Sequence, residues 1–113
     1  MLRRYEISQA AARDGVWRVA VSGDVDLSAH DELLQAILSA VAAGAAKVIV
    51  DLGDVTFFDS GAVGVLIAGR NAAKRAECGY RVVDPPSLVR RVLRTTGILD
   101  LLTSDPGDHR QTA

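Results

Sequence analysis

The sequence of 113 residues contains few aromatic residues and only one cysteine. Phe, Trp and Tyr make up 4% of the chain, so a core has to be built mainly from Val, Leu, Ile and Ala. Cys78 has no second cysteine with which to form an internal disulfide or a cysteine-based metal site. Such a composition suits a reducing compartment. We therefore expect a buried, idle thiol and a cytoplasmic protein.

The sequence also lacks an excess of charge and a long hydrophobic run. Thirteen basic and 14 acidic residues give a formal net charge of −1, which offers no electrostatic attraction for nucleic acid. No apolar run approaches the roughly 18 residues of a membrane span. The first eight residues turn polar before an apolar signal core could form. We expect no nucleic-acid partner, no direct membrane contact and no export.

Residues that usually carry catalysis are scarce. His30 and His109 are the only histidines, and His109 lies near the C-terminus. The chain has no Gly-x-Ser-x-Gly elbow and no phosphate loop ending in Lys-Ser or Lys-Thr. The glycines at positions 61, 64 and 69 do not form a dinucleotide-binding fingerprint. We predict that the protein is not an enzyme and has no catalytic residue, metal or cofactor.

Hydrophobic periodicity predicts alternating strands and helices. Asp14 and Gly15 form a hairpin signal between the first two strands. Expected strands cover residues 3–11, 16–23, 47–52 and 80–83, and expected helices cover residues 27–44, 60–77 and 85–97. Ser28 is the expected N-cap of the first helix, and Gly44 should end it. This order predicts a single α/β domain in residues 1–104, with a small, mostly parallel sheet behind an N-terminal β-hairpin. Residues 105–113 are expected to form a flexible tail.

The segment 47–52, "KVIVDL", is apolar on both faces and should be a central parallel strand. A bacterial receiver domain has a similar length and alternation, and Asp51 ends this strand where a phosphoacceptor would lie. Receivers, however, need a lysine at the end of a late strand. The only lysines here are Lys47 and Lys74, and neither is so placed. The receiver interpretation is therefore rejected.

The helix expected from Ser60 has two apolar residues on its polar side. Val63 and Ile67 lie on the same stripe as Ser60 when residues are placed about 100° apart. Isolated exposed apolar residues are common and need no function. Clustered beside a helix start, they would instead suit a partner protein. We expect this pair to be more exposed than Val65 and Leu66.

Ser60 itself has two interpretations. Ser and Asp are favoured N-caps, so Asp59 or Ser60 could satisfy the first free N–H groups of the helix. The same helix start could also tolerate a phosphate on Ser60. A phosphate would add about −1.5 to −2 charges, facing Asp59 and, if the "GDVD" loop lies alongside, Asp26.

Three segments together resemble the STAS domains, and within them the bacterial anti-sigma factor antagonists. They are "VAVSGDVDLSAHDEL", "KVIVDLGDVTFFDSGAVGVLIAG" and "LVRRVLRTTGILDLL", and they span residues 16–102 in family order. The resemblance implies a mixed sheet with helices mainly on one side. It also implies that Ser60 is phosphorylated by a partner that is both anti-sigma factor and serine kinase, that a serine phosphatase reverses this, and that Asp26, Asp59 and Gly61 are neighbours of the phosphosite. Val63, Gly64 and Ile67 are the expected partner-binding residues.

Two features depart from the family pattern. The family usually has Asp-Ser-Ser/Thr-Gly-Leu-Gly, whereas Gly61 and Ala62 occupy the Ser/Thr-Gly positions here, with Val63 for Leu and Gly64 retained. The chain also ends soon after Leu102, where relatives often add a final helix. STAS domains occur as well in stress-signalling assemblies, in lipid-transport complexes and as nucleotide binders, so an unphosphorylated module is the alternative function.

Overall fold

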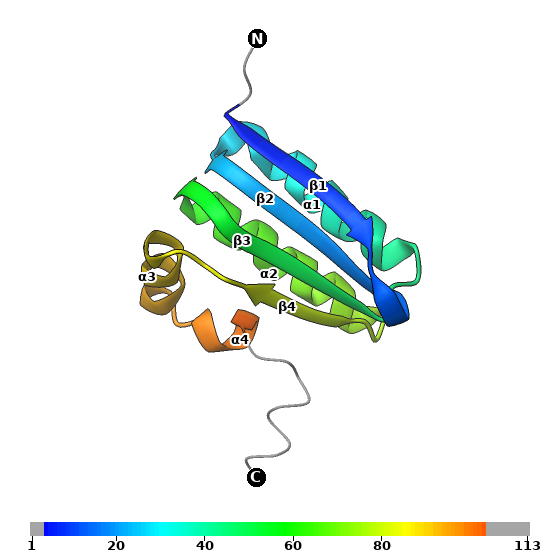
Figure 1. Ribbon diagram of the computed structural model, residues 1–113. Coiled ribbons are helices and arrows are strands. Elements are labelled where there is room, and N and C mark those ends of the chain that lie inside the picture. The colour runs from blue at the N-terminus through cyan, green and yellow to red at the C-terminus, as the bar shows by residue number, and fades with distance from the viewer. Residues whose placement is uncertain (1–3, 104–113) are drawn as a thin grey trace.

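The computed structural model describes residues 4–103 as a four-stranded sheet with helices (Figure 1). The strands are β1 (Tyr5–Ala11), β2 (Val16–Val25), β3 (Lys47–Phe58) and β4 (Gly79–Val83). The helices are a short 3₁₀ turn, η1 (Arg13–Gly15), followed by α1 (Leu27–Ala42), α2 (Ser60–Arg75), α3 (Ser87–Thr95) and α4 (Leu99–Thr103). The predicted boundary at residue 104 and the predicted tail at 105–113 lie outside the described residues.

The sheet has the order β1-β2-β3-β4, with β1 antiparallel to β2 and the other two pairs parallel. The mixed, mostly parallel sheet and the hairpin at its edge confirm the prediction. The hairpin turns at Asp14 and Gly15, which both have positive φ, as the Asp-Gly signal requires. β3 lies between β2 and β4, so "KVIVDL" is central as expected. The strand continues to Phe58 and is twice as long as predicted.

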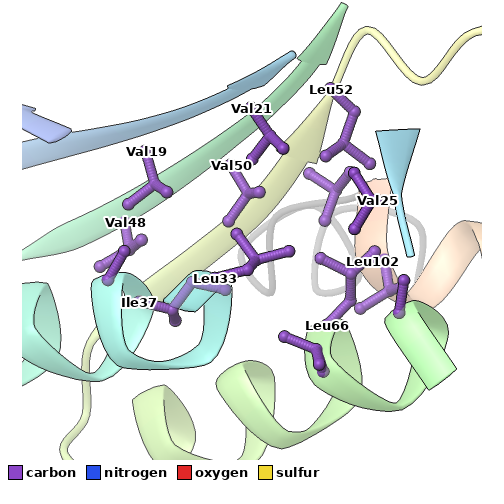
Figure 2. Packing of buried hydrophobic residues seen from close by; sticks show 14 of the residues in the cluster. Val19, Val21, Val25, Leu33, Ile37, Val48, Val50, Leu52, Leu66 and Leu102 are labelled. Atoms are coloured by element: carbon purple, nitrogen blue, oxygen red, sulfur yellow. The ribbon is translucent and has the colours of Figure 1, made fainter. Parts of the chain in front are cut away.

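Helices α1 and α2 cover one face of the sheet, whereas α3 and α4 lie beyond the β4 edge (Figure 1). Between the helices and the sheet lies a core of branched aliphatic side chains. Figure 2 shows sheet valines and a leucine facing side chains of α1 and α2, and the residues at this contact include Val19, Val21, Val48, Val50, Leu52, Leu33, Ile37 and Leu66. Each buried Leu, Ile or Val stabilises the fold by about 1.5–3 kcal/mol. The core therefore fixes α1 and α2 firmly against β2 and β3.

The last apolar segment forms α4, whose Leu102 is fully buried beside Leu66 (Figure 2). α1 ends at Ala42, and Gly44, just after the C-cap, has the left-handed conformation of the predicted glycine stop. Cys78 is buried, also as predicted, and burial raises the pKa of its thiol. Among residues 4–103, no helix is long and apolar enough to cross a bilayer.

Candidate functional site

The first two helices begin side by side at one edge of the sheet. β2 and β3 run parallel, and their register pairs Val25 with Phe58, the last residues of both strands. Asp26 and Asp59 follow directly and are the N-caps of α1 and α2. The parallel register thus brings both aspartates and Ser60 to the same edge of the sheet.

At the start of α2, Asp59 and not Ser60 caps the helix. The Asp59 backbone is extended, and its Oδ1 accepts a hydrogen bond of 2.8 Å from the Ala62 N–H. Ser60 is the first helical residue and is exposed. Among the hydrogen bonds of residues 4–103, none involves the Ser60 hydroxyl. Asp59 is therefore the residue that caps α2, and Ser60 is exposed to solvent.

At the start of α1, the N-cap is Asp26 and not Ser28, so the prediction of a serine cap is wrong. Oδ1 of Asp26 accepts hydrogen bonds from the Ser28 N–H at 3.0 Å and from the Ser28 hydroxyl at 2.6 Å. The Ser28 hydroxyl is the main reason that the pKa of Asp26 lies below its ordinary value. An aspartate one position before the expected start reaches the free N–H groups better than Ser28, which is already inside the first turn.

His30 is a member of this site that sequence reasoning missed. Its Nε2 lies 2.7 Å from Oδ1 of Asp59, the same oxygen that accepts the Ala62 N–H. Because an ionised carboxylate only accepts, Nε2 of His30 donates. The imidazole also lies directly against Gly61, where an added Cβ would be 2.3 Å from Cε1 of His30. Gly61 therefore provides the space in which His30 reaches the cap of the neighbouring helix.

A signal for this contact was present in the sequence. Glycine inside a helix costs about 1 kcal/mol relative to alanine, so a helical glycine often marks a close approach. Gly61 is the second residue of α2, where the helix itself does not require a glycine. The identity of the approaching side chain, 31 positions earlier in the chain, could not be read from the sequence.

The predicted partner-binding residues separate into two groups. Val63 is 5% exposed, less than Val65 at 8%, so its prediction as a surface residue is wrong. α2 packs against α1 as well as against the sheet, and the buried arc is therefore wider than one face. Ile67 is partly exposed, as expected relative to Leu66 and Val65, although it also packs against the core.

Gly64 is exposed, and a Cβ added there would meet nothing within 4 Å. The other two helical glycines of α2 have contacts that explain them. A Cβ at Gly61 would meet His30, and one at Gly69 would lie 2.8 Å from Ile37. Packing among residues 4–103 therefore gives no reason for glycine at position 64.

Two large apolar side chains extend the exposed surface at this edge. Leu27, the first residue of α1, is 80% exposed, and Phe57, near the end of β3, is 45% exposed. Phe57 pairs with Asp24 in the parallel register. Sequence reasoning missed both, because each adjoins an acidic turn and not an apolar stripe.

A serine nucleophile is activated by a hydrogen bond to a base such as an imidazole. In the described part of the chain, the carboxylate–imidazole pair of Asp59 and His30 has no hydrogen bond to Ser60. Among the described residues, no group of three or more His, Cys, Asp or Glu side chains is placed to hold a metal ion. What the site offers is an exposed Ser60 at a helix start, at the same sheet edge as two aspartates and two exposed apolar side chains.

The family model described as "Mlab, STAS domain" matches residues 8–103, which include both strand ends and the whole site. The chain belongs to the STAS domain family. No curated protein sequence matches this STAS domain significantly.

Solved structures share the fold of this STAS domain. An anti-sigma factor antagonist from Mycobacterium paratuberculosis is 29% identical, with a TM-score of 0.76 over 88% of this chain and 82% of that chain. The unphosphorylated form of the anti-sigma factor antagonist SpoIIAA is 19% identical, with a TM-score of 0.73 over 95% and 93% of the two chains. The phosphorylated form of the Bacillus cell fate determinant SpoIIAA is 18% identical, with a TM-score of 0.68 over 95% and 96%. At these identities, the similarity to SpoIIAA shows a shared fold only.

Proposed function

We propose that this STAS domain is an anti-sigma factor antagonist controlled by phosphorylation of Ser60. With Ser60 unmodified, it binds an anti-sigma factor that is also a serine kinase, and a sigma factor is released. Phosphorylation ends the binding, and a serine phosphatase restores it. In this proposal the domain works in the cytoplasm, has no catalytic residue of its own and needs no cofactor.

The observation that carries the proposal is the free hydroxyl of Ser60. Asp59 caps α2, so the fold has no evident need for a serine at the next position. Ser60 is exposed on a helix start held by the core, where a kinase can reach it. Helix N-termini also tolerate phosphate, because their free N–H groups and dipole favour negative charge.

The neighbouring charges explain how a phosphate would act as a signal. A phosphoserine carries about −1.5 to −2 charges at neutral pH. It would lie beside Asp59 and at the same sheet edge as Asp26. The resulting concentration of negative charge would repel an acidic partner surface and would resist burial in an apolar contact. Phe57 and Leu27 are the exposed apolar side chains that such a contact would cover.

Gly64 supports a partner that approaches α2 closely. An exposed helical glycine lowers helix stability by about 1 kcal/mol relative to alanine. In the part of the chain that the structure describes, no contact accounts for that cost at Gly64. A partner backbone or side chain lying against α2 would account for it, and the partly exposed Ile67 one turn later would belong to the same contact.

The comparisons support the same class of function. The Mycobacterium paratuberculosis protein, 29% identical over most of this chain, is described as an anti-sigma factor antagonist. SpoIIAA, described in the same words, has solved structures in unphosphorylated and phosphorylated forms.

The proposal is tested by incubating the protein with its cognate anti-sigma factor and labelled ATP. Wild type should incorporate phosphate, and Ser60→Ala should not, while both bind the partner before ATP is added. Ser60→Ala should remain bound after ATP, whereas wild type should dissociate. Equal labelling of both proteins would place the acceptor elsewhere. Absence of labelling in wild type that binds the partner would favour a STAS module without phosphorylation, as in a stress-signalling, lipid-transport or nucleotide-binding assembly.

A further inference from the structure

His30 connects the first turns of α1 and α2. It lies in the first turn of α1, yet its hydrogen bond is to Asp59, the cap of α2. The His30 side chain is 16% exposed and the Asp59 side chain 31%, so the bond is only partly open to water. A bond of 2.7 Å in such a place restrains both side chains more than a pair fully in solvent.

Two hydrogen bonds, one from each helix, restrain the same carboxylate oxygen of Asp59. The Ala62 N–H fixes Oδ1 of Asp59 to its own helix, and His30 Nε2 fixes it to α1. Loss of His30 would leave Oδ1 of Asp59 held by the Ala62 N–H alone, so the carboxylate would leave the helix start more often. Ser60 follows Asp59 directly, so the backbone that presents its hydroxyl would lose definition too.

The contact between His30 and Asp59 requires glycine at position 61. Any side chain at position 61 would place a Cβ 2.3 Å from Cε1 of His30 and would push the imidazole away. The ring and the glycine are therefore one unit, and substitutions at the two positions should not be independent.

We propose that His30 is a positioning residue for Ser60, which acts through Asp59 and needs Gly61 to do so. The inference rests on the proposed function for its kinetic consequence. His30 does not touch the hydroxyl, and the exposed surface around Gly64 lies a turn further along α2. His30 therefore sets the rate of phosphate transfer to Ser60 and leaves docking of the kinase unchanged, because orientation of the acceptor governs the chemical step.

The first experiment needs no kinase. In His30→Ala, amide exchange at Ala62 and Val63 should become about tenfold faster than in wild type, since their N–H groups are held by Asp59. In His30→Gln, whose amide can still donate to Asp59, exchange should stay within about twofold of wild type. Asp31→Ala, at an exposed neighbour on α1, is the matched control. Unchanged exchange in His30→Ala would overturn the positioning role.

The second experiment measures phosphorylation by the cognate kinase in the intact protein. His30→Ala should lower kcat about three- to tenfold with KM changed less than twofold, and His30→Gln should restore most of kcat. If His30→Ala changes only KM, or changes neither kcat nor KM, the positioning role of His30 is wrong. Labelling of wild type in the same experiment would still support the proposed function. Failure to label wild type would instead reject the proposed function, and amide exchange would still decide whether His30 positions the turn.

The third experiment combines substitutions at positions 30 and 61 in a double-mutant cycle. Gly61→Ser alone should lower kcat and accelerate exchange at Ala62, because the new side chain displaces the ring. Combining it with His30→Ala should lower kcat no further than the larger of the two single effects, because both substitutions remove the same hydrogen bond to Asp59. Additive effects of the two substitutions would show that they are not one unit and would contradict the proposal.

Discussion

The starts of α1 and α2 have the same type of N-cap, but the hydrogen bonds to the two capping carboxylates differ. Each helix follows a parallel strand and has an aspartate as N-cap. The carboxylate of Asp26 is bonded within its own turn, by the N–H and the hydroxyl of Ser28. The carboxylate of Asp59 is bonded by its own turn and by His30 of the other helix. One cap is thus local, whereas the other belongs to the tertiary structure.

This difference indicates what each turn can respond to. A local cap depends on a few consecutive residues and should behave alike in an isolated helix and in the protein. A cap shared between helices depends on how α1 and α2 lie against each other. The turn next to Ser60 is the shared one, so changes in helix packing can reach the proposed phosphosite.

The largest expected effect comes from removing each cap. Asp59→Ala should lower the free energy of unfolding by about 2 kcal/mol, at the upper end for an N-cap, because it also leaves the buried side of His30 without an acceptor. Asp26→Ala should have a clearly smaller effect, since its carboxylate and the Ser28 hydroxyl remain accessible to water. Urea unfolding of both variants is the measurement. An equal loss for the two would remove the distinction between local and shared caps.

A second effect, of about 1 kcal/mol and opposite in sign, is expected at Gly64. Gly64→Ala should stabilise the protein, because the position is helical and a Cβ there meets nothing. The same substitution should weaken partner binding if the partner lies against α2. Gly69→Ala is the matched control and should destabilise, since its Cβ would crowd Ile37 and Tyr80. Thermal unfolding and a binding titration test both statements, and undiminished affinity in Gly64→Ala would remove Gly64 from the interface.

A smaller effect distinguishes the first helical residues, Ser60 of α2 and Leu27 of α1. Both are exposed and neither caps its helix, so Ser60→Ala and Leu27→Ala should each change stability by less than about 0.5 kcal/mol. Only Ser60→Ala should abolish phosphate incorporation. A loss well above that limit in Ser60→Ala would restore a structural role to the serine.

The smallest expected effect is a loss of stability at low pH through protonation of Asp26. The pKa of Asp26 is lowered, chiefly by the Ser28 hydroxyl, from an ordinary value of 3.8. A lowered pKa in the folded state means that the stabilisation is present above pH 3.8 and is lost as the pH falls through the lower value. Carboxyl chemical shifts followed by NMR should show the titration of Asp26 below 3.8, and Ser28→Ala should move it upward. A titration unchanged by Ser28→Ala would contradict the assigned cause.

Much of this fold could be predicted from local patterns. Val48, Val50 and Leu52 of "KVIVDL" alternate along the strand and are buried, and Asp14-Gly15 has the positive φ angles that its turn requires. The start of α2 was located for the same reason, because a polar residue precedes an apolar repeat. These features depend on neighbours within a few residues, which the sequence displays directly.

The errors arose where distant elements meet. Helical periodicity predicts an exposed Val63 because it allows for one buried face, but α1 covers a second face of α2. The role of His30 depends on the parallel register that aligns Val25 with Phe58, and only then does α1 reach Asp59. Residue preference predicts Ser28 as the N-cap, whereas Asp26 has the extended backbone and the side-chain hydrogen bond of a cap. Ser60 as phosphoacceptor and Gly64 and Ile67 as partner contacts remain predictions.

The contact between His30 and Gly61 also restricts the order in which this site can evolve. A lineage that first gains any side chain at position 61 has to pass through an ancestor in which the imidazole is displaced from Asp59. A lineage that first replaces His30 by a smaller residue loses one hydrogen bond and can then accept serine or alanine at position 61. Descendants of this chain should therefore change position 30 before position 61, and lineages that acquire histidine should already have glycine opposite it.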